Sequence, residues 1–568
     1  MRKMTTNKQS RPGAISIAMV FILIQLFFTY SASANPLHSM EDQLRLGERM
    51  YREGILPSGA PMQAFIKGDF SVPGTSFSCA SCHLRSGLGS YEGSVFTPPT
   101  TGKELFKPLN MIYKNVEADK KVFTPILFRP AYTETSLAEA LRGGLSPSGK
   151  TLSPVMPRYH LEDGDMALLI TYLKSLSKDF SPGATDKELH FATVITDDVL
   201  PEEYEAMLAP LEKYVSHKNN MINLYKKEKR SERMAATMVQ STELLYKKFT
   251  LSRWMLKGPP ETWRGQLEEY YRKDPVFALL GGISNSDWKP IHDFSEAYHI
   301  PCLFPQTNFP VVSDTDWYTL YLSKGYYQEG EGAARYLNSR FESEKGGIVV
   351  QIVRVSHQTE ALSKGFVQTW SELGHNAAVT ITLKPEEPIT REFIQNLLQK
   401  ERPTAILIWD DSRALPVLEM LSAEKDRPGI VIVAGSALGS SLWSIAEQSR
   451  DFIYITYPER LPQDEERFKV YINPYKNNPK FDTSEDSILK RSFITTQMLT
   501  YSLMDMRGNY YRDNFFDVIG MMADQLFPLY ERISFGPGQR YASKGCYIVQ
   551  LNKGPKSELV KKSNWVIH

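Results

Sequence analysis

The chain has 568 residues, with 66 Lys+Arg against 65 Asp+Glu, a formal net charge of +1, and 42% hydrophobic residues. This length predicts two or three domains with cores of their own, and the balanced charge gives no indication of nucleic-acid binding. No run after residue 30 approaches the roughly 18 consecutive apolar residues that span a membrane, so we expect no span in the mature protein.

The first 34 residues have the pattern of a secretory signal peptide. Basic residues precede the apolar run "AISIAMVFILIQLFF", which ends in the small-residue sequence Ala32-Ser33-Ala34. We expect cleavage before Asn35 and export to the periplasm or the outside of a bacterial cell, an oxidising place. The alternative is an uncleaved membrane anchor.

A Cys-x-x-Cys-His motif, "CASCH", lies at residues 79–83. A zinc knuckle requires further ligands, and no second cysteine pair exists. A thioredoxin-like redox pair follows a strand, whereas these flanks are rich in glycine and loop-like. The motif therefore predicts covalent attachment of one haem c through Cys79 and Cys82, with His83 as an axial iron ligand.

A second axial ligand is expected about 70 residues downstream, in "SPVMPRYH". Met156 stands between Pro154 and Pro157, ahead of an amphipathic helix predicted from about residue 161 to 176. A thioether there suits a low-spin electron-transfer haem, so we predict Met156 as the distal ligand, with His160 as the competing residue. Arg142 and Arg158 are candidate partners of the haem propionates, but the more common state of such an arginine is to be solvated.

Residues 40–178 resemble a class I c-type cytochrome. The resemblance rests on the helix "QLRLGERMYREG", the "CASCH" motif, the "VMPRY" segment and the closing helix "ALLITYLKSL". It implies an all-α domain whose first and last helices cross tightly, which Gly47 and Tyr51 on one helix face would permit. About 25 residues separate the first helix from the motif, which is longer than in the smallest members of the family.

From about residue 188, after a short connector at residues 177–186, short apolar runs alternate with amphipathic helical patterns. The runs are at residues 189–196, 276–283, 300–307, 347–355, 377–383, 404–410, 429–437 and 452–458. Buried β-branched runs separated by helices predict α/β lobes with parallel sheets. We place this domain at residues 188–535, its second lobe at about 347–460, and a C-terminal strand and tail at 536–568.

This domain resembles the type I periplasmic substrate-binding proteins of the branched-chain amino-acid branch. The matching stretches are "FALLGGISNSDWKPIHDFSEAYHIPCLFPQTNFPV", "YYQEGEGAARYLN", "GFVQTWSELG" and "NFFDVIGMMADQL". The resemblance implies a two-lobed cleft for a small, amino-acid-like ligand. Carried over by position, the resemblance also implies a set of ligand-binding residues. They are Ser284, Asn285, Gln306, Thr307, Ser356, Asp411 and Ser436, with His357 and Asp410 as further candidates.

Helix capping is the alternative role for several of these residues, including Ser284, Thr307 and Asp411. No catalytic constellation stands out, so we expect no enzyme. Cys302 and Cys546 remain open between a disulfide and buried free thiols.

The leading hypothesis is a secreted mono-haem cytochrome c that transfers electrons to or from an unknown redox partner and is fused to a ligand-binding domain. The alternative is a solute receptor for an ABC transporter with an accessory redox-sensing haem domain. A haem peroxidase is a third hypothesis, but it requires an open iron site, which Met156 argues against.

Overall fold

The chain forms two compact units, residues 1–178 and 179–568. The computed structural model describes residues 39–66, 70–92, 95–112, 126–227, 247–313, 315–341, 347–465, 486–536, 538–554 and 556–567. The predicted signal peptide lies outside the described residues. Within them, no helix is both long and apolar enough to cross a membrane.

The N-terminal unit contains helices and three small antiparallel sheets. The helices are α2 (Met40–Glu53), α3 (Cys79–His83), α4 (Gly102–Leu105), α5 (Glu134–Gly143) and α6 (Asp163–Ser175). The sheets are β2-β1-β7 (Phe70–Pro73, Gln63–Ile66, Arg158–His160), β3-β4 (Ser90–Glu92, Val95–Thr97) and β5-β6 (Leu109–Ile112, Ile126–Arg129). The expectation of an all-α domain is therefore corrected, because the long segment after α2 pairs its backbone groups as strands.

Helices α2 and α6 cross closely, as the sequence predicts. A Cβ atom at Gly47 would lie 2.5 Å from the carbonyl oxygen of Leu168 and 2.6 Å from Cβ of Tyr172. The rings of Tyr51 and Tyr172 pack at a centroid distance of 5.5 Å, and Tyr51 is fully buried. Only glycine permits this approach, so Gly47 sets the distance between the helices around which the unit packs.

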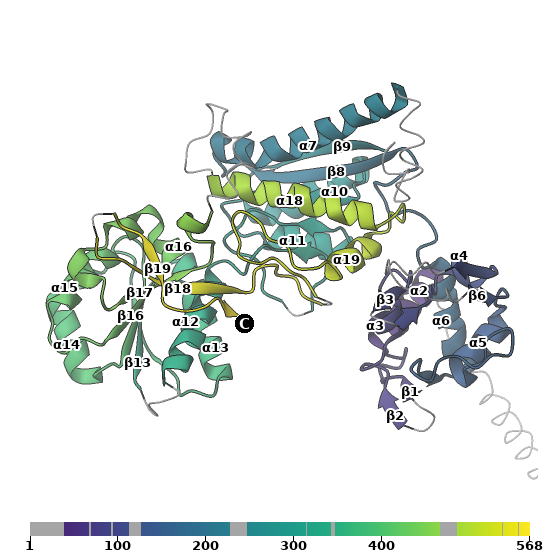
Figure 1. Ribbon diagram of the computed structural model, residues 1–568, viewed down its shortest axis with the longest axis horizontal. Coiled ribbons are helices and arrows are strands. Elements are labelled where there is room, and N and C mark those ends of the chain that lie inside the picture. Colours follow the sequence, from purple (N-terminus) through teal and green to yellow (C-terminus); the bar gives the residue numbers. More distant parts are fainter. Residues whose placement is uncertain are drawn as a thin grey trace, which may run out of the picture. The chain divides into compact units, whose positions relative to one another are not determined.

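The C-terminal unit is built from two α/β lobes (Figure 1). The sheet of lobe 1 has the order β12-β11-β10-β8-β9 and is entirely parallel. Its strands are β8 (Glu188–Thr196), β9 (Lys248–Leu256), β10 (Ala278–Leu280), β11 (Cys302–Leu303) and β12 (Thr319–Leu320). The prediction of a parallel sheet is confirmed here, although the patterning missed β9 and β12.

The sheet of lobe 2 has the order β14-β13-β15-β16-β17-β18-β19. Five parallel strands, β13 (Val349–Arg354), β14 (Val379–Leu383), β15 (Ala405–Trp409), β16 (Ile430–Ala434) and β17 (Ile453–Tyr457), are followed by antiparallel β18 (Gly545–Leu551) and β19 (Leu559–Lys561). The last strand, β20 (Val566–Ile567), pairs with β18. The expected C-terminal strand is thus an integral part of lobe 2.

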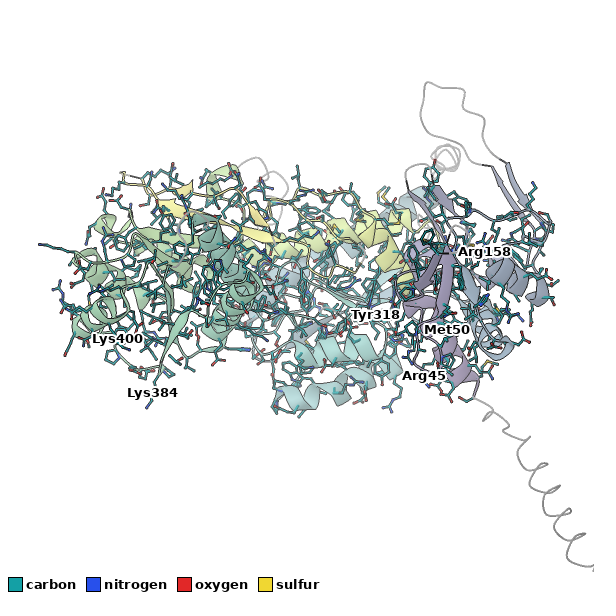
Figure 2. The ribbon with its side chains drawn as sticks, turned by 90° about the horizontal axis from the view of Figure 1, so that it is seen from below. Arg45, Met50, Arg158, Tyr318, Lys384 and Lys400 are labelled. Atoms are coloured by element: carbon teal, nitrogen blue, oxygen red, sulfur yellow. The ribbon has the colours of Figure 1, made fainter. Side chains whose placement is uncertain are left out.

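Helices cover both faces of each sheet. In lobe 2, α12 (Tyr326–Phe341) and α13 (His357–Glu372) pack on one face, and α14 (Arg391–Glu401) and α15 (Ala414–Ser422) on the other (Figure 1). Lys384 and Lys400 are exposed side chains of this lobe (Figure 2). Because α12 packs on this sheet, lobe 2 begins earlier in the chain than the predicted boundary at about residue 347.

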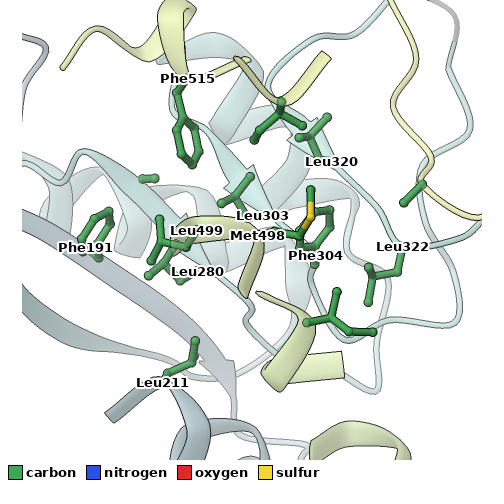
Figure 3. Close-up of a cluster of buried hydrophobic side chains, with 14 of the residues drawn as sticks. Phe191, Leu211, Leu280, Leu303, Phe304, Leu320, Leu322, Met498, Leu499 and Phe515 are labelled. Atoms are coloured by element: carbon green, nitrogen blue, oxygen red, sulfur yellow. The ribbon is translucent and has the colours of Figure 1, made fainter. Parts of the chain in front are cut away.

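In lobe 1, α10 (Trp263–Lys273) and α11 (Lys289–Ala297) cover one face of the sheet. The other face is covered by α7 (Pro201–Lys227), α18 (Asp486–Asp505) and α19 (Arg512–Gly520). Figure 3 shows Met498, Leu499 and Phe515 from the late helices packed with Phe191, Leu280 and Leu303 from the strands. The chain therefore returns to lobe 1 after building most of lobe 2, so the lobes are joined by more than one crossing of the chain.

Candidate functional site

The N-terminal unit contains a cavity with about 1020 Å³ of space free of protein atoms, part of it open to solvent. Its lining includes Cys79, Cys82, His83 and Met156. Most of the other lining side chains are apolar or aromatic: Tyr51, Phe77, Val95, Phe96, Leu141, Leu152, Val155, Tyr159, Leu169 and Leu173. The structure thus brings the motif and the predicted methionine to one apolar cavity.

The turn after α3 holds His83 in place. Leu84 adopts a left-handed backbone conformation with φ 65°, which is unusual for a residue with a Cβ atom. The hydroxyl of the buried Tyr51 donates a hydrogen bond of 2.8 Å to the carbonyl oxygen of Leu84. The α2–α6 pair therefore fixes the turn that ends the motif.

The imidazole of His83 is suited to be a metal ligand. Its Nδ1 lies 2.7 Å from the carbonyl oxygen of Pro98, and a carbonyl only accepts, so Nδ1 carries the proton and Nε2 keeps its lone pair. Burial lowers the pKa of His83, which favours the neutral form. A neutral imidazole with its other nitrogen hydrogen-bonded is the usual state of a ligating histidine.

The two motif cysteines are both free thiols, but they differ in environment. Cys79 is shielded, and burial raises its pKa to about 12, whereas Cys82 is exposed. Among the described residues, no group of three or more His, Cys, Asp or Glu side chains is arranged to hold a metal ion. The described residues therefore offer no set of protein ligands for zinc around these thiols.

The loop that carries Met156 is held by Arg158. The Arg158 guanidinium donates to the carbonyl oxygens of Met156 and of Leu152, the latter at 3.1 Å. His160 lies elsewhere: it is exposed, packs on Phe65 at a centroid distance of 5.1 Å, and does not line the cavity. Of the two residues considered for the distal position, Met156 is the one at the cavity.

Arg142 and Arg158 do not line the cavity either. Arg142 donates to the carbonyl oxygen of Leu161 at 2.6 Å and pairs with Asp163 at 2.8 Å. Both arginines thus stabilise the loops near α6 by donating hydrogen bonds to backbone carbonyl oxygens.

In the C-terminal unit, a cleft with about 1620 Å³ of atom-free space, part of it open to solvent, lies between the lobes. The five parallel strands of each lobe share the order 2-1-3-4-5, counted in chain order from β8 in lobe 1 and from β13 in lobe 2. In this arrangement the carboxyl ends of the strands form the binding edge. Both edges contribute to the cleft.

Lobe 1 contributes residues that follow β10 and β11. Ser284 and Asn285 come after Gly281 and Gly282, whose φ values of 60° and 94° turn the chain at the strand end. Gln306 and Thr307 follow β11 and line the same cleft. Four of the predicted ligand-binding residues are therefore brought together by lobe 1.

Lobe 2 contributes residues that follow β16 and β17. Ser436, after β16, lines the cleft as predicted, together with Tyr457 at the end of β17 and Glu459 after it. Beneath Ser436 lies the fully buried Glu329, whose carboxylate accepts from the Thr456 hydroxyl at 2.6 Å and from the Ser436 amide at 3.5 Å. Burial raises the pKa of Glu329 to about 7.

Ser356 and Asp411 do not line this cleft, so the structure does not assemble the whole predicted set. The Ser356 hydroxyl caps α13 by accepting from the amide of Thr359 at 3.2 Å. The Asp411 carboxylate accepts from the Arg413 side chain at 2.9 Å, and these neighbours hold the pKa of Asp411 below its usual value despite partial burial. Both side chains are engaged by local capping and pairing.

The further candidates of lobe 2 are engaged as well. Asp410 and Arg354 form a buried ion pair of 2.7 Å at the ends of β15 and β13. His357 stacks on Phe309 at a centroid distance of 4.0 Å. The point between β13 and β15, where a ligand would be expected from topology alone, is therefore filled by an arginine and its carboxylate.

Sequence patterning missed several cleft residues, above all Arg491 on α18, and also Tyr326 and Trp443. Arg491 is separated from Ser284 by about 200 residues, and no local motif marks it. Only the return of the chain to lobe 1 places it at the cleft.

Cys302 and Cys546 are both buried free thiols in different clusters of core residues. The hypothesis of a disulfide between them is wrong, and the alternative of buried thiols is confirmed.

No family model matches this chain, and neither does any curated protein. It is similar to a putative branched-chain amino acid ABC transporter protein from Rhodospirillum rubrum, at 10% identity over 62% of this chain and 99% of that one, with a TM-score of 0.44. A solute binding protein from Rhodopseudomonas palustris BisB5 in complex with 3,4-dihydroxy benzoic acid matches at 12% identity over 68% and 99%, with a TM-score of 0.46. A branched chain amino acid ABC transporter protein from Thermus thermophilus with bound valine matches at 11% identity over 67% and 97%, with a TM-score of 0.43. The strand orders given above define the two lobes independently of these distant similarities.

Proposed function

We propose that this protein is a secreted receptor for a small solute, of the kind that serves an ABC transporter, and that its N-terminal unit carries one covalently bound haem c. The observation that carries the receptor function is the cleft, to which the strand ends of both lobes contribute polar side chains and backbone. Such a cleft suits a ligand that is enclosed between two lobes rather than one held on a surface.

The receptor function is tested by thermal unfolding of the purified protein against amino acids, small organic acids, alcohols and sugars. A ligand at free concentration L that binds only the folded state stabilises it by RT ln(1 + L/Kd), so the melting temperature rises with the logarithm of the ligand concentration once this exceeds the dissociation constant. We expect at least one class of compound to stabilise the protein. If none does so, the receptor function is rejected.

Electron transfer is a second candidate function, and the cavity of the N-terminal unit favours it. Two thiols, a neutral imidazole and a thioether line one apolar cavity, which is the donor set that a six-coordinate haem c uses. Cys79 and Cys82 would hold the group covalently, and His83 and Met156 would supply its axial ligands. A bound haem supplies reversible one-electron transfer.

The chain's own residues prepare this cavity. Tyr51 fixes the Leu84 turn, Pro98 fixes the tautomer of His83, and Arg158 fixes the Met156 loop. The apolar lining would limit the access of water to a bound haem, which would favour its reduced state relative to a wetter site. Because His83 and Met156 would both hold the iron, a bound haem would serve electron transfer rather than peroxidase chemistry.

The haem is tested by expression with a c-type maturation system and intact-mass measurement. We expect one haem adduct per chain. Oxidised protein should show the weak sulfur-to-iron band at the red end of the visible spectrum, and Met156→Ala should abolish it, whereas His160→Ala should leave it unchanged. The opposite result for the two variants would transfer the distal position to His160.

A further inference from the structure

Arg491 is the one basic side chain among the described residues that line the interlobe cleft. It lies in the second turn of α18 and its side chain is 22% exposed. A guanidinium is charged at any physiological pH, so this side chain places a permanent positive charge in the cleft.

The hydrogen bonds of this guanidinium are incomplete. One terminal nitrogen, Nη2, donates to Oε1 of Glu459 at 3.3 Å, which is long for a charge-assisted hydrogen bond. Its Nε is buried and has no hydrogen-bond partner among the described residues. Since a buried donor without a partner is destabilising, a ligand oxygen that reached Nε when the lobes close on it would remove this cost.

The surroundings of Arg491 describe the rest of such a ligand. Tyr326, Tyr457 and Trp443 line the cleft with aromatic surface, which suits an apolar or aromatic body. The side-chain oxygen Oε1 of Gln306, a residue 5% exposed, also has no partner among the described residues. This acceptor suits a hydroxyl or amino group on the ligand.

Building on the proposed receptor function, we infer that the cleft binds a small organic carboxylate and that Arg491 is the residue that holds its carboxylate group. A carboxylate matches the planar guanidinium with two parallel hydrogen bonds, whereas the present partners of Arg491 are the long contact to Glu459 and the Tyr530 side chain. Glu459 should weaken binding, because it competes for the Arg491 guanidinium and its carboxylate repels that of the ligand.

The test is calorimetric titration of the full chain with benzoate, mandelate, lactate and valine, each beside the primary amide that replaces its carboxylate. We expect at least one carboxylate to bind and its amide to bind about tenfold more weakly or worse, the loss typical of a charge-assisted hydrogen bond. Arg491→Gln should weaken the carboxylate by a similar factor, and Arg491→Lys should weaken it too, since lysine keeps the charge but lacks the Nε edge. Glu459→Gln should tighten binding.

Arg253→Gln is the matched control, because Arg253 is an exposed arginine of lobe 1 that pairs with Glu212 away from the cleft. It should leave the affinity unchanged. Should Arg491→Gln fail to fold, the signs of the Arg491→Lys and Glu459→Gln effects still decide the inference.

Equal binding of acid and amide, or affinity indifferent to Arg491, would overturn the inference. Glycerol and glucose are included to separate the two claims. If a neutral compound binds and no carboxylate does, the receptor function stands and the role of Arg491 falls. If nothing binds, both fall.

Discussion

The cavity of the N-terminal unit and the cleft of the C-terminal unit collect their chemistry in different ways. Two thiols and an imidazole lie within the five residues Cys79–His83, and only Met156 comes from afar. The cleft instead draws Ser284, Ser436 and Arg491 from strand ends and a helix separated by tens to hundreds of residues. A site in one helical turn depends on the local sequence, whereas a site at two sheet edges depends on topology.

The difference also appears in how each site is supported. Around His83, single contacts from Tyr51 and Pro98 hold a turn in place. In lobe 2, buried ionisable groups lie at the strand ends, namely the Arg354–Asp410 pair after β13 and β15, and Glu329 against Thr456 of β17. We therefore expect substitutions at the N-terminal cavity to affect the group bound there, and substitutions of the buried groups of lobe 2 to lower the stability of that lobe.

The largest expected effect is that of Cys79→Ser combined with Cys82→Ser. Without thiols no thioether bond to haem forms, so the covalent adduct and its absorption at the Soret wavelength should be lost completely. Intact-mass and visible spectra check this. Cys302→Ser, a change at a buried thiol of the other unit, should keep the adduct, and an adduct in the double variant would break the comparison.

The next largest effect is expected for Asp410→Ala. It leaves Arg354 buried without its carboxylate, a change that costs about 3–5 kcal/mol of unfolding free energy. Asp411→Ala, at the adjacent and exposed carboxylate, should cost about 1 kcal/mol or less. Denaturant unfolding monitored on the C-terminal unit measures both, and similar losses for the two variants would contradict the difference in burial.

Glu329→Gln should change the pH dependence of stability. The folded-state pKa of Glu329 is raised by burial from 4.5 to about 7. The folded protein therefore holds a proton that the unfolded chain releases, so this group's contribution to stability is complete below about pH 4.5 and is lost as the pH rises through about 7. The whole span corresponds to about 3 kcal/mol.

The Glu329→Gln variant keeps an acceptor for Thr456 and removes the titration. We expect it to be more stable than the wild type at about pH 8 and nearly equal at about pH 5. Unfolding free energies at the two pH values decide this. Cys546, Glu459 and Tyr326 face the same site, but burial raises the pKa of Cys546 and of Tyr326 above this pH range, so an unchanged slope in the variant would show that Glu329 is not its source.

The smallest effect is expected for Ser356→Ala. Loss of the cap of α13 should lower stability by about 1 kcal/mol and leave ligand affinity unchanged. Ser436→Ala, at a residue that lines the cleft, should instead weaken ligand binding. A loss of affinity in Ser356→Ala would return this residue to the ligand-binding set.

The sequence by itself predicted much about each region. Short continuous apolar runs located eight of the parallel strands, because strands buried on both faces of a sheet are apolar along their whole length. Gly47 and Tyr51 predicted the helix crossing, since a missing side chain and a large ring leave a local signature. The motif at residues 79–83 predicted a cluster of thiols and an imidazole, because neighbours in one helical turn stay neighbours after folding.

Only the tertiary structure decided which strand-end residues reach the cleft. Ser356 and Asp411 follow strands just as Ser284 and Ser436 do, yet capping and the Arg413 contact engage them first. The two-residue strand β12 carries too few residues for a pattern, and β9 lacks a continuous apolar run. Arg491 reaches the cleft because α18 returns to lobe 1, a long-range packing choice made by the apolar faces of the lobes and by no motif near residue 491.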